Sequence, residues 1–206
     1  MREADCGSRQ IQELFMTSIV RRSFFIAIAI GVFTLVVSPV QAAKEKTEDE
    51  LIADLASPKE DVVASAMLKL EKQFPTSAKA IVEIKKYLGD NRAKVRRKAA
   101  RVLGVLHTDV TSAEIKTICA LFKSADQREV MDGLIALRGL KAAEALPEIV
   151  PLLNHAAPNV IRDACRTIAV LGGKEHIPLI EPLLKNADPK VQLDAQDAIF
   201  KLKAKS

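Results

Sequence analysis

The chain has 206 residues and a formal net charge of +5; 49% of its residues are apolar, but only 4% are aromatic. An apolar fraction this high excludes a wholly disordered chain. The mild charge and the absence of tryptophan exclude the strong positive field and the aromatic platforms that nucleic-acid binding requires. The core must therefore be built from Ala, Leu, Ile and Val, which favours closely packed helices.

The first 42 residues are predicted to be a secretory signal peptide. Two arginines precede the uncharged stretch "FFIAIAIGVFTLVV" at 24–37, and Val40 and Ala42 satisfy the small-residue rule for cleavage before Ala43. A basic start, a short apolar stretch and such a site are typical of exported proteins. A membrane span needs about 20 apolar residues, so an uncleaved anchor in the inner membrane is the less favoured alternative.

The predicted location is therefore the periplasm or the medium, with no stable membrane insertion after cleavage. Met16 would begin a signal peptide of ordinary length, which leaves the true start open. The motif "RRSFF" leaves twin-arginine export as an alternative to general secretion. Residues 43–48 are interpreted as a short polar linker. Residues 1–42 hold four basic and three acidic side chains, so their removal leaves a net charge of +4.

The rest of the chain repeats itself. The segment "ALPEIVPLLNHAAPNV" at 145–160 aligns with "HIPLIEPLLKNADPKV" at 176–191, an offset of 31 residues. Looser copies occupy 49–62, 80–95 and 114–130. Each copy ends on a marker valine, and these are Val62, Val95, Val130, Val160 and Val191. Self-similarity at a period of 30–35 residues indicates a repeat architecture.

Each repeat is predicted to be a pair of helices. The first is short and apolar at i, i+3/i+4 and i+7, and the second begins near the marker valine and runs for three turns. Pro151 and Pro182 lie inside first helices, which they must bend or interrupt. The "LGG" at 171–173 is interpreted as a helix C-terminus with glycine in the left-handed conformation. Ala99, Ala164 and Ala195 share one repeated site, where we expect helices to approach closely.

The segments "VRRKAARVLG" and "LGGKEHIPLIEPLLKNADPKV" resemble HEAT repeats, specifically the short bacterial type also found in phycobilisome-lyase-like proteins. The resemblance extends over roughly residues 49–204. It implies an all-α fold, an α-solenoid of about five antiparallel helix pairs in a domain at 49–206. It also implies that the second helices line an inner, concave face. The family implies a binding surface and no particular activity.

The predicted second helix at 95–106 has one apolar side and one basic side. Lys94, Arg97, Lys98 and Arg101 fall opposite the core stripe when the segment is wound at 100° per residue. The Arg97 and Arg101 positions recur as arginines in the fourth repeat, while the third repeat holds aspartate at the Arg97 position. The candidate partner-binding residues are Lys94, Arg97, Arg101, Asp132, Arg162 and Arg166.

Two interpretations of this row remain open. The alternating charges could form a ladder that holds neighbouring repeats in register, which is the favoured interpretation. They could instead form an anion-binding groove for an acidic protein or peptide, and then at least two of the four arginines should have no carboxylate partner. If the ladder is correct, the binding surface is expected on the loops that carry "GDNRAK" and "NHAAPN".

No catalytic, cofactor or metal site is predicted. His107, His155 and His176 fall in different repeats without a cysteine or carboxylate at ligand spacing. No glycine-rich phosphate loop or nucleophile motif is present in the sequence. Cys119 and Cys165 fit apolar helical patterns and are expected in the core. The predicted function is an exported, non-catalytic scaffold or adaptor that binds a protein or peptide, and the alternative is a HEAT-repeat enzyme of the bilin-lyase-like kind.

Overall fold

The computed structural model describes residues 45–205, so the predicted signal peptide and its cleavage site lie outside the described residues. The described residues form ten α-helices and no strand, which confirms the all-α prediction. In chain order the helices are α2 (Glu48–Leu55), α3 (Glu60–Gln73), α4 (Ala78–Lys85), α5 (Ala93–Val105), α6 (Ser112–Cys119), α7 (Gln127–Gly139), α8 (Leu146–Ile149), α9 (Pro158–Leu171), α10 (Ile177–Ile180) and α11 (Pro189–Lys203).

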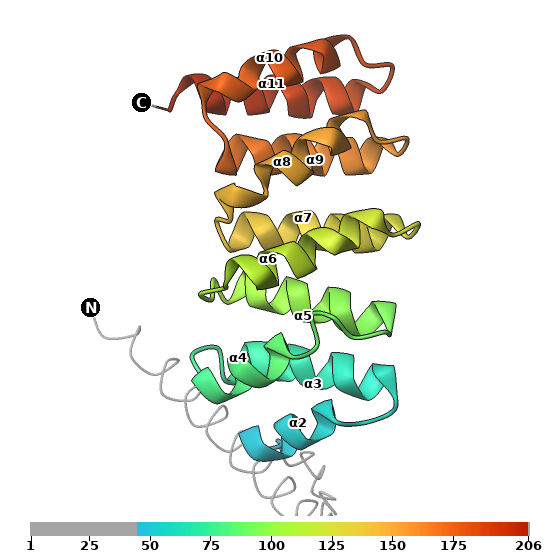
Figure 1. The fold of residues 1–206 in the computed structure, drawn as a ribbon, viewed down its shortest axis with the longest axis vertical. Coiled ribbons are helices and arrows are strands. Elements are labelled where there is room, and N and C mark those ends of the chain that lie inside the picture. Colours follow the sequence, from blue (N-terminus) through green and yellow to red (C-terminus); the bar gives the residue numbers. More distant parts are fainter. Residues whose placement is uncertain (1–44, 206) are drawn as a thin grey trace, which may run out of the picture. The chain divides into compact units, whose positions relative to one another are not determined.

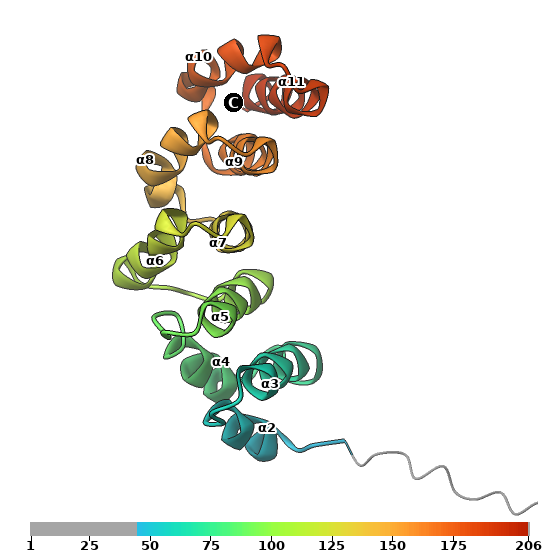
Figure 2. The same cartoon turned by 90° about the vertical axis from the view of Figure 1, so that its right-hand side faces the viewer.

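The helices stack as five pairs in two layers (Figure 1). The first helices of the repeats, α2, α4, α6, α8 and α10, form one layer, and the longer second helices form the other. Figure 2 shows that the second-helix layer lies on the inner side of a shallow arc. The α-solenoid and the inner position of the second helices are therefore as expected.

One hydrophobic core runs through the stack between the two layers. Ala99, Ala164 and Ala195 have no exposed surface, as expected for a repeated site of close packing. Cys119 and Cys165 are buried free thiols, so their predicted place in the core is confirmed. The first repeat differs from the alignment, because Val62 is only partly buried while Val63 has no exposed surface.

The helical unit begins slightly earlier than the sequence suggests. Thr47 caps α2, since its side chain accepts a hydrogen bond from the Glu50 N–H while the Glu50 carboxylate accepts one from the Thr47 N–H. This reciprocal arrangement satisfies backbone donors that a helix start leaves unpaired. The predicted linker at 43–48 therefore overlaps the first helix, which starts at Glu48.

The prolines inside the first helices shorten them as predicted. Helix α8 ends at Ile149 and the chain continues as the 3₁₀ turn η3 (Val150–Asn154), whose second residue is Pro151. The fifth repeat has the same construction, with η5 (Glu181–Lys185) and Pro182. Proline lacks the N–H that an α-helix interior requires. The layer of first helices is therefore built from short pieces that follow the curve of the stack.

The glycine pair after α9 does not adopt the left-handed conformation that was predicted. Gly172 has φ −82° and Gly173 has φ −123°. The left-handed residues are instead His107 (φ 50°) and Lys141 (φ 55°), which follow α5 and α7. At Lys141 the next N–H, of Ala142, reaches back to the carbonyl of Leu137 at 3.1 Å. The α9 terminus needs no such turn, because the chain leaves it in an extended conformation.

Helices α5 and α7 approach so closely that only glycine fits between them. A Cβ atom on Gly104 would lie 2.6 Å from the Cα atom of Ala136, and one on Gly139 would lie 2.2 Å from the Gly104 carbonyl oxygen. Such distances are far shorter than van der Waals contact. The second and third repeats are therefore joined backbone to backbone on the inner layer.

Candidate functional site

The basic row on the inner layer is paired with carboxylates of the neighbouring repeats. From α5, Arg101 Nη1 lies 3.1 Å from Asp132 Oδ1 on α7. Arg97 lies 3.6 Å from Asp132 through Nε and 3.6 Å from Asp126 through Nη1. Lys94 contacts Asp61 of the first repeat. Helix α5 is thus linked by charge to both of its neighbours.

The same construction joins the fourth and fifth repeats. Arg162 Nε lies 2.6 Å from Asp194 Oδ2, and Arg166 Nε lies 2.9 Å from Asp194 Oδ1. Arg166 also pairs with Asp163 on its own helix at 3.3 Å. Asp194 is one of the carboxylates that the sequence comparison missed, because it stands one place beyond Leu193, the residue of the fifth repeat in the compared row. The sequence signal was a carboxylate three residues after the marker Val191.

The expectation that at least two of the four arginines would have no carboxylate partner is wrong. Each of them contacts at least one aspartate, and most of these aspartates belong to the following repeat. Asp132 belongs to the row compared in the sequence, whereas Asp126 and Asp194 stand at positions outside that row. The row has the contacts of an inter-repeat ladder, in line with the favoured interpretation.

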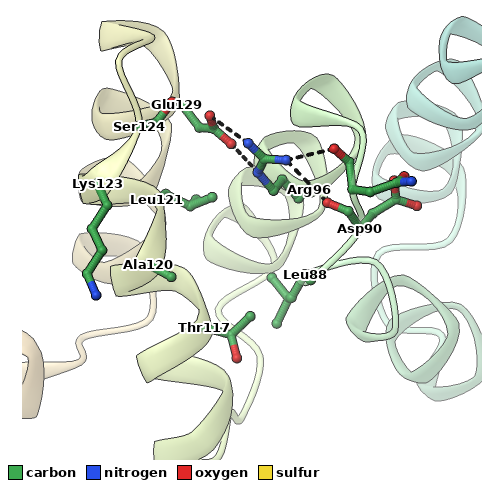
Figure 3. Close-up of a pocket in the computed structure, with 11 residues that line it drawn as sticks. Leu88, Asp90, Arg96, Thr117, Ala120, Leu121, Lys123, Ser124 and Glu129 are labelled. Atoms are coloured by element: carbon green, nitrogen blue, oxygen red, sulfur yellow. Dashed lines mark hydrogen bonds and ion pairs between the residues drawn. The ribbon is translucent and has the colours of Figure 1, made fainter.

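A cavity of about 420 Å³ lies between the second and third repeats (Figure 3). It opens beside the loop "GDNRAK", one of the two loops on which the ladder interpretation placed the binding surface. Side chains of both repeats form its walls. The lining residues are Leu88, Gly89, Asp90, Asn91, Arg96, Thr117, Ala120, Leu121, Lys123, Ser124 and Glu129.

One side of this cavity is formed by an ion pair between a buried glutamate and a partly exposed arginine. Glu129 is only 1% exposed, and its carboxylate accepts hydrogen bonds from Arg96, one of them at 3.0 Å from Nη2 to Oε2. Figure 3 shows Arg96 between Glu129 and the turn at Asp90. Arg96 Nη1 donates to the carbonyl oxygen of Asn91 at 3.0 Å. All three guanidinium nitrogens of Arg96 therefore donate within the chain, and the charge of Glu129 balances that of Arg96.

The loop beside the cavity is held firmly. Asp90 accepts hydrogen bonds from Arg92 Nη2 at 2.7 Å and Nε at 2.9 Å, and these bonds hold the pKa of the Asp90 carboxyl below its ordinary value. Arg92 Nη1 donates in turn to the carbonyl oxygen of Ser57 in the first repeat at 3.0 Å. The turn is thus tied to the preceding repeat, and Arg96 ties the same helix to the following one.

The described side chains show no activated nucleophile. Burial raises the pKa of the Cys119 thiol to about 11 and that of Cys165 to about 12, so both stay protonated near neutrality. Each histidine makes a hydrogen bond with the backbone, as His155 Nδ1 does by accepting from the Ala157 N–H at 3.0 Å. Within residues 45–205 no group of three potential metal ligands comes together. Across that same range, no helix has the length and apolar character needed to cross a membrane.

Comparison with known proteins identifies the fold. No family model and no curated protein matches the sequence. Among solved structures, the chain is similar to the complex of CpcE and CpcF of phycocyanin lyase from Nostoc sp. PCC7120, with 21% identity and a TM-score of 0.67. That match covers 81% of this chain and 69% of the other.

Two synthetic solenoids are similar as well. One is an engineered protein, with 20% identity and a TM-score of 0.59 over 77% of this chain and 80% of that one. The other is a designed armadillo repeat protein in complex with the peptide (KR)4, with 20% identity and a TM-score of 0.55 over 74% and 80%. At these identities the likeness shows the fold alone. The α-solenoid fold that the HEAT-repeat resemblance implies is confirmed.

Proposed function

We propose that this α-solenoid is an exported, non-catalytic scaffold that binds a protein or peptide. The export half of the proposal is supported by the signal peptide predicted at 1–42. The binding half is supported by the cavity between the second and third repeats. Repeat proteins of this type commonly present extended surfaces to partners, and the armadillo neighbour was solved with a bound peptide.

The chemistry of the cavity favours an apolar side chain of the partner. Leu88 and Leu121 supply apolar wall, while Arg96 and Glu129 neutralise each other. A charged ligand group would have to compete with the existing ion pair, whereas an apolar group leaves it intact and is removed from water. The pairing of the arginine row also removes the reason to expect an acidic partner. The partner is therefore proposed to be a protein segment with an exposed aliphatic or aromatic anchor.

The alternative is an enzyme of the bilin-lyase-like kind. Its support is the similarity to the structure of CpcE and CpcF, and at 21% identity this similarity shows the fold alone. An activated nucleophile or base would favour it, but the two thiols in the described residues are buried and have raised pKa values. The scaffold proposal is thus preferred on the chemistry of these side chains.

The decisive experiment blocks the cavity without disturbing the core. Ala120 lines the cavity and is exposed, so Ala120→Trp should fill the opening while the fold persists. Ala113→Trp, at an exposed site that does not line the cavity, is the matched control. The tagged full chain would be cross-linked in its host, and the partner recovered from the extracytoplasmic fraction and identified by mass spectrometry.

We expect Ala120→Trp to reduce recovery of that partner about tenfold or more, which corresponds to the loss of one interface anchor. The Ala113→Trp chain should retain the partner. Equal recovery by both variants would remove the cavity from the proposal. Recovery of the chain from the cytoplasm alone would overturn its export.

A further inference from the structure

The charge of the described residues is unevenly distributed along the stack. Residues 78–139, which form the second and third repeats, hold thirteen basic and seven acidic side chains, a net charge of +6. The other described residues, 45–77 and 140–205, hold thirteen basic and sixteen acidic side chains, a net charge of −3. The cavity of about 420 Å³ lies between the two basic repeats. The part of the molecule that holds the cavity therefore also holds the excess of positive charge.

The acidic side chains of these two repeats are almost all paired within the chain. Six of the seven form salt bridges. The exception is Asp109, which follows the end of α5, whereas the cavity lies beside the start of that helix. Five basic side chains of the two repeats have no ion-pair partner among residues 45–205, and these are Lys98, Lys116, Lys123, Arg128 and Arg138.

Two of these unpaired cations lie beside the cavity. Lys123 lines it, and Arg128 is next in sequence to the lining residue Glu129. Both side chains are exposed. Figure 3 shows the Lys123 side chain directed away from the ion pair of Arg96 and Glu129. Its ammonium group is therefore accessible, at the rim of the cavity, to a carboxylate of a bound partner.

We propose that the partner segment is acidic, with an apolar anchor in the cavity and flanking carboxylates against Lys123 and Arg128. This inference rests on the proposed function and adds the charge of the partner to it. The arginine row is paired and gives no reason for such a choice, but these two unpaired cations do. An apolar anchor leaves the pair of Arg96 and Glu129 intact, so the anchor and the carboxylates do not compete for the same protein groups.

The anchor and the carboxylates contribute to binding in different ways. Charges at the rim of a binding site chiefly raise the association rate and make it sensitive to salt. Their attraction extends over about 8 Å at physiological ionic strength. An anchor buried in a pocket acts mostly on the dissociation rate. The two contributions can therefore be separated by kinetics.

The test uses synthetic peptides and the full chain purified from its host. The probe peptide has one phenylalanine between two blocks of four glutamates. Two matched peptides replace either all the glutamates by lysine or the phenylalanine by glycine. A DNA strand of nine nucleotides carries the same number of negative charges without the anchor. We expect the probe peptide to bind about tenfold or more tightly than each of the other three ligands.

A charge-reversal variant tests the two cations. Lys123→Glu with Arg128→Glu should lower the association rate of the probe peptide about tenfold at low salt, and the difference should vanish in about 1 M salt. The matched control is Lys185→Glu with Lys190→Glu in the fifth repeat. Lys185 ends η5 as Lys123 ends η1, and Lys190 is the second residue of α11 as Arg128 is of α7. Both double variants change the net charge equally, and both should keep the melting temperature.

The acidic partner is overturned if the probe peptide binds no better than the lysine or glycine peptide or the DNA strand. Equal association rates for the two double variants would overturn it as well. The Ala120→Trp chain distinguishes this failure from that of the proposed function. If Ala120→Trp weakens binding while the two double variants bind alike, the cavity stands and only the charge of the partner is wrong. If Ala120→Trp binds the probe peptide like the unchanged chain, the cavity is not the binding site and both proposals fail.

Discussion

At the scale of single residues, Gly104 sets the distance between two repeats. We expect Gly104→Ala to destabilise the protein by about 1–3 kcal/mol, because the added carbon meets the backbone of Ala136. The gain in helix propensity, about 1 kcal/mol, does not offset this clash. Chemical denaturation would measure the difference. Gly89→Ala is the control, since a Cβ atom there meets nothing within 4 Å, and it should change stability by less than about 0.5 kcal/mol.

Ala164 tests the repeat register that the sequence alone predicts. Its side chain has no exposed surface at the centre of α9, so Ala164→Leu should overpack the core and destabilise the protein by about 1–3 kcal/mol. Val170→Leu, on the exposed side of the same helix, should be nearly neutral. A loss below about 0.5 kcal/mol for Ala164→Leu in thermal or chemical unfolding would contradict the close packing assigned to this site.

At the scale of elements, paired charges join neighbouring second helices. The double variant Arg97→Gln with Arg162→Gln should lose about 0.5–2 kcal/mol, because each partly exposed pair contributes about 0.2–1 kcal/mol. That corresponds to a fall of a few degrees in melting temperature. The difference in melting temperature between the double variant and the unchanged chain should become smaller in about 1 M salt, where charges are strongly screened.

The control for that experiment is Lys69→Gln with Lys72→Gln on α3. These exposed lysines have no ion-pair partner among residues 45–205, so their loss should leave the melting temperature nearly unchanged. Equal falls in melting temperature for the two double variants would show that the loss of positive charge in general, and not the loss of the ladder, lowers the stability. Binding of the proposed partner should survive both double variants, because the cavity residues are untouched.

At the scale of the whole molecule, the proposed export concerns which residues the mature protein retains. We predict that its mature N-terminus is Ala43, from the apolar stretch at 24–37 and the small residues before the site. Intact-mass spectrometry of the protein from its own host checks this directly. A species that retains residues 24–37 would contradict cleavage and favour the membrane-anchored alternative.

The sequence by itself determined the fold of this protein to the level of five helix pairs. The 31-residue offset and the marker valines indicate which side of each helix is apolar. The prolines at 151 and 182 indicate where the first helices of the last two repeats must break. These are local properties, because helical periodicity depends on neighbours within two turns. For the same reason the spacing of the alanines and cysteines predicted that they are buried. In the first repeat the buried valine is Val63, one residue after the predicted marker Val62.

Only the tertiary structure decided what the surfaces can do. Whether Arg162 has a carboxylate partner depends on Asp194, which lies about one repeat away and one place beyond the aligned position. Gly104 cannot take a larger side chain only because α7 packs against it. The cavity beside Glu129 likewise depends on how one repeat lies against the next. Such contacts join residues about 30 positions apart, and helical periodicity within one repeat carries no information about them.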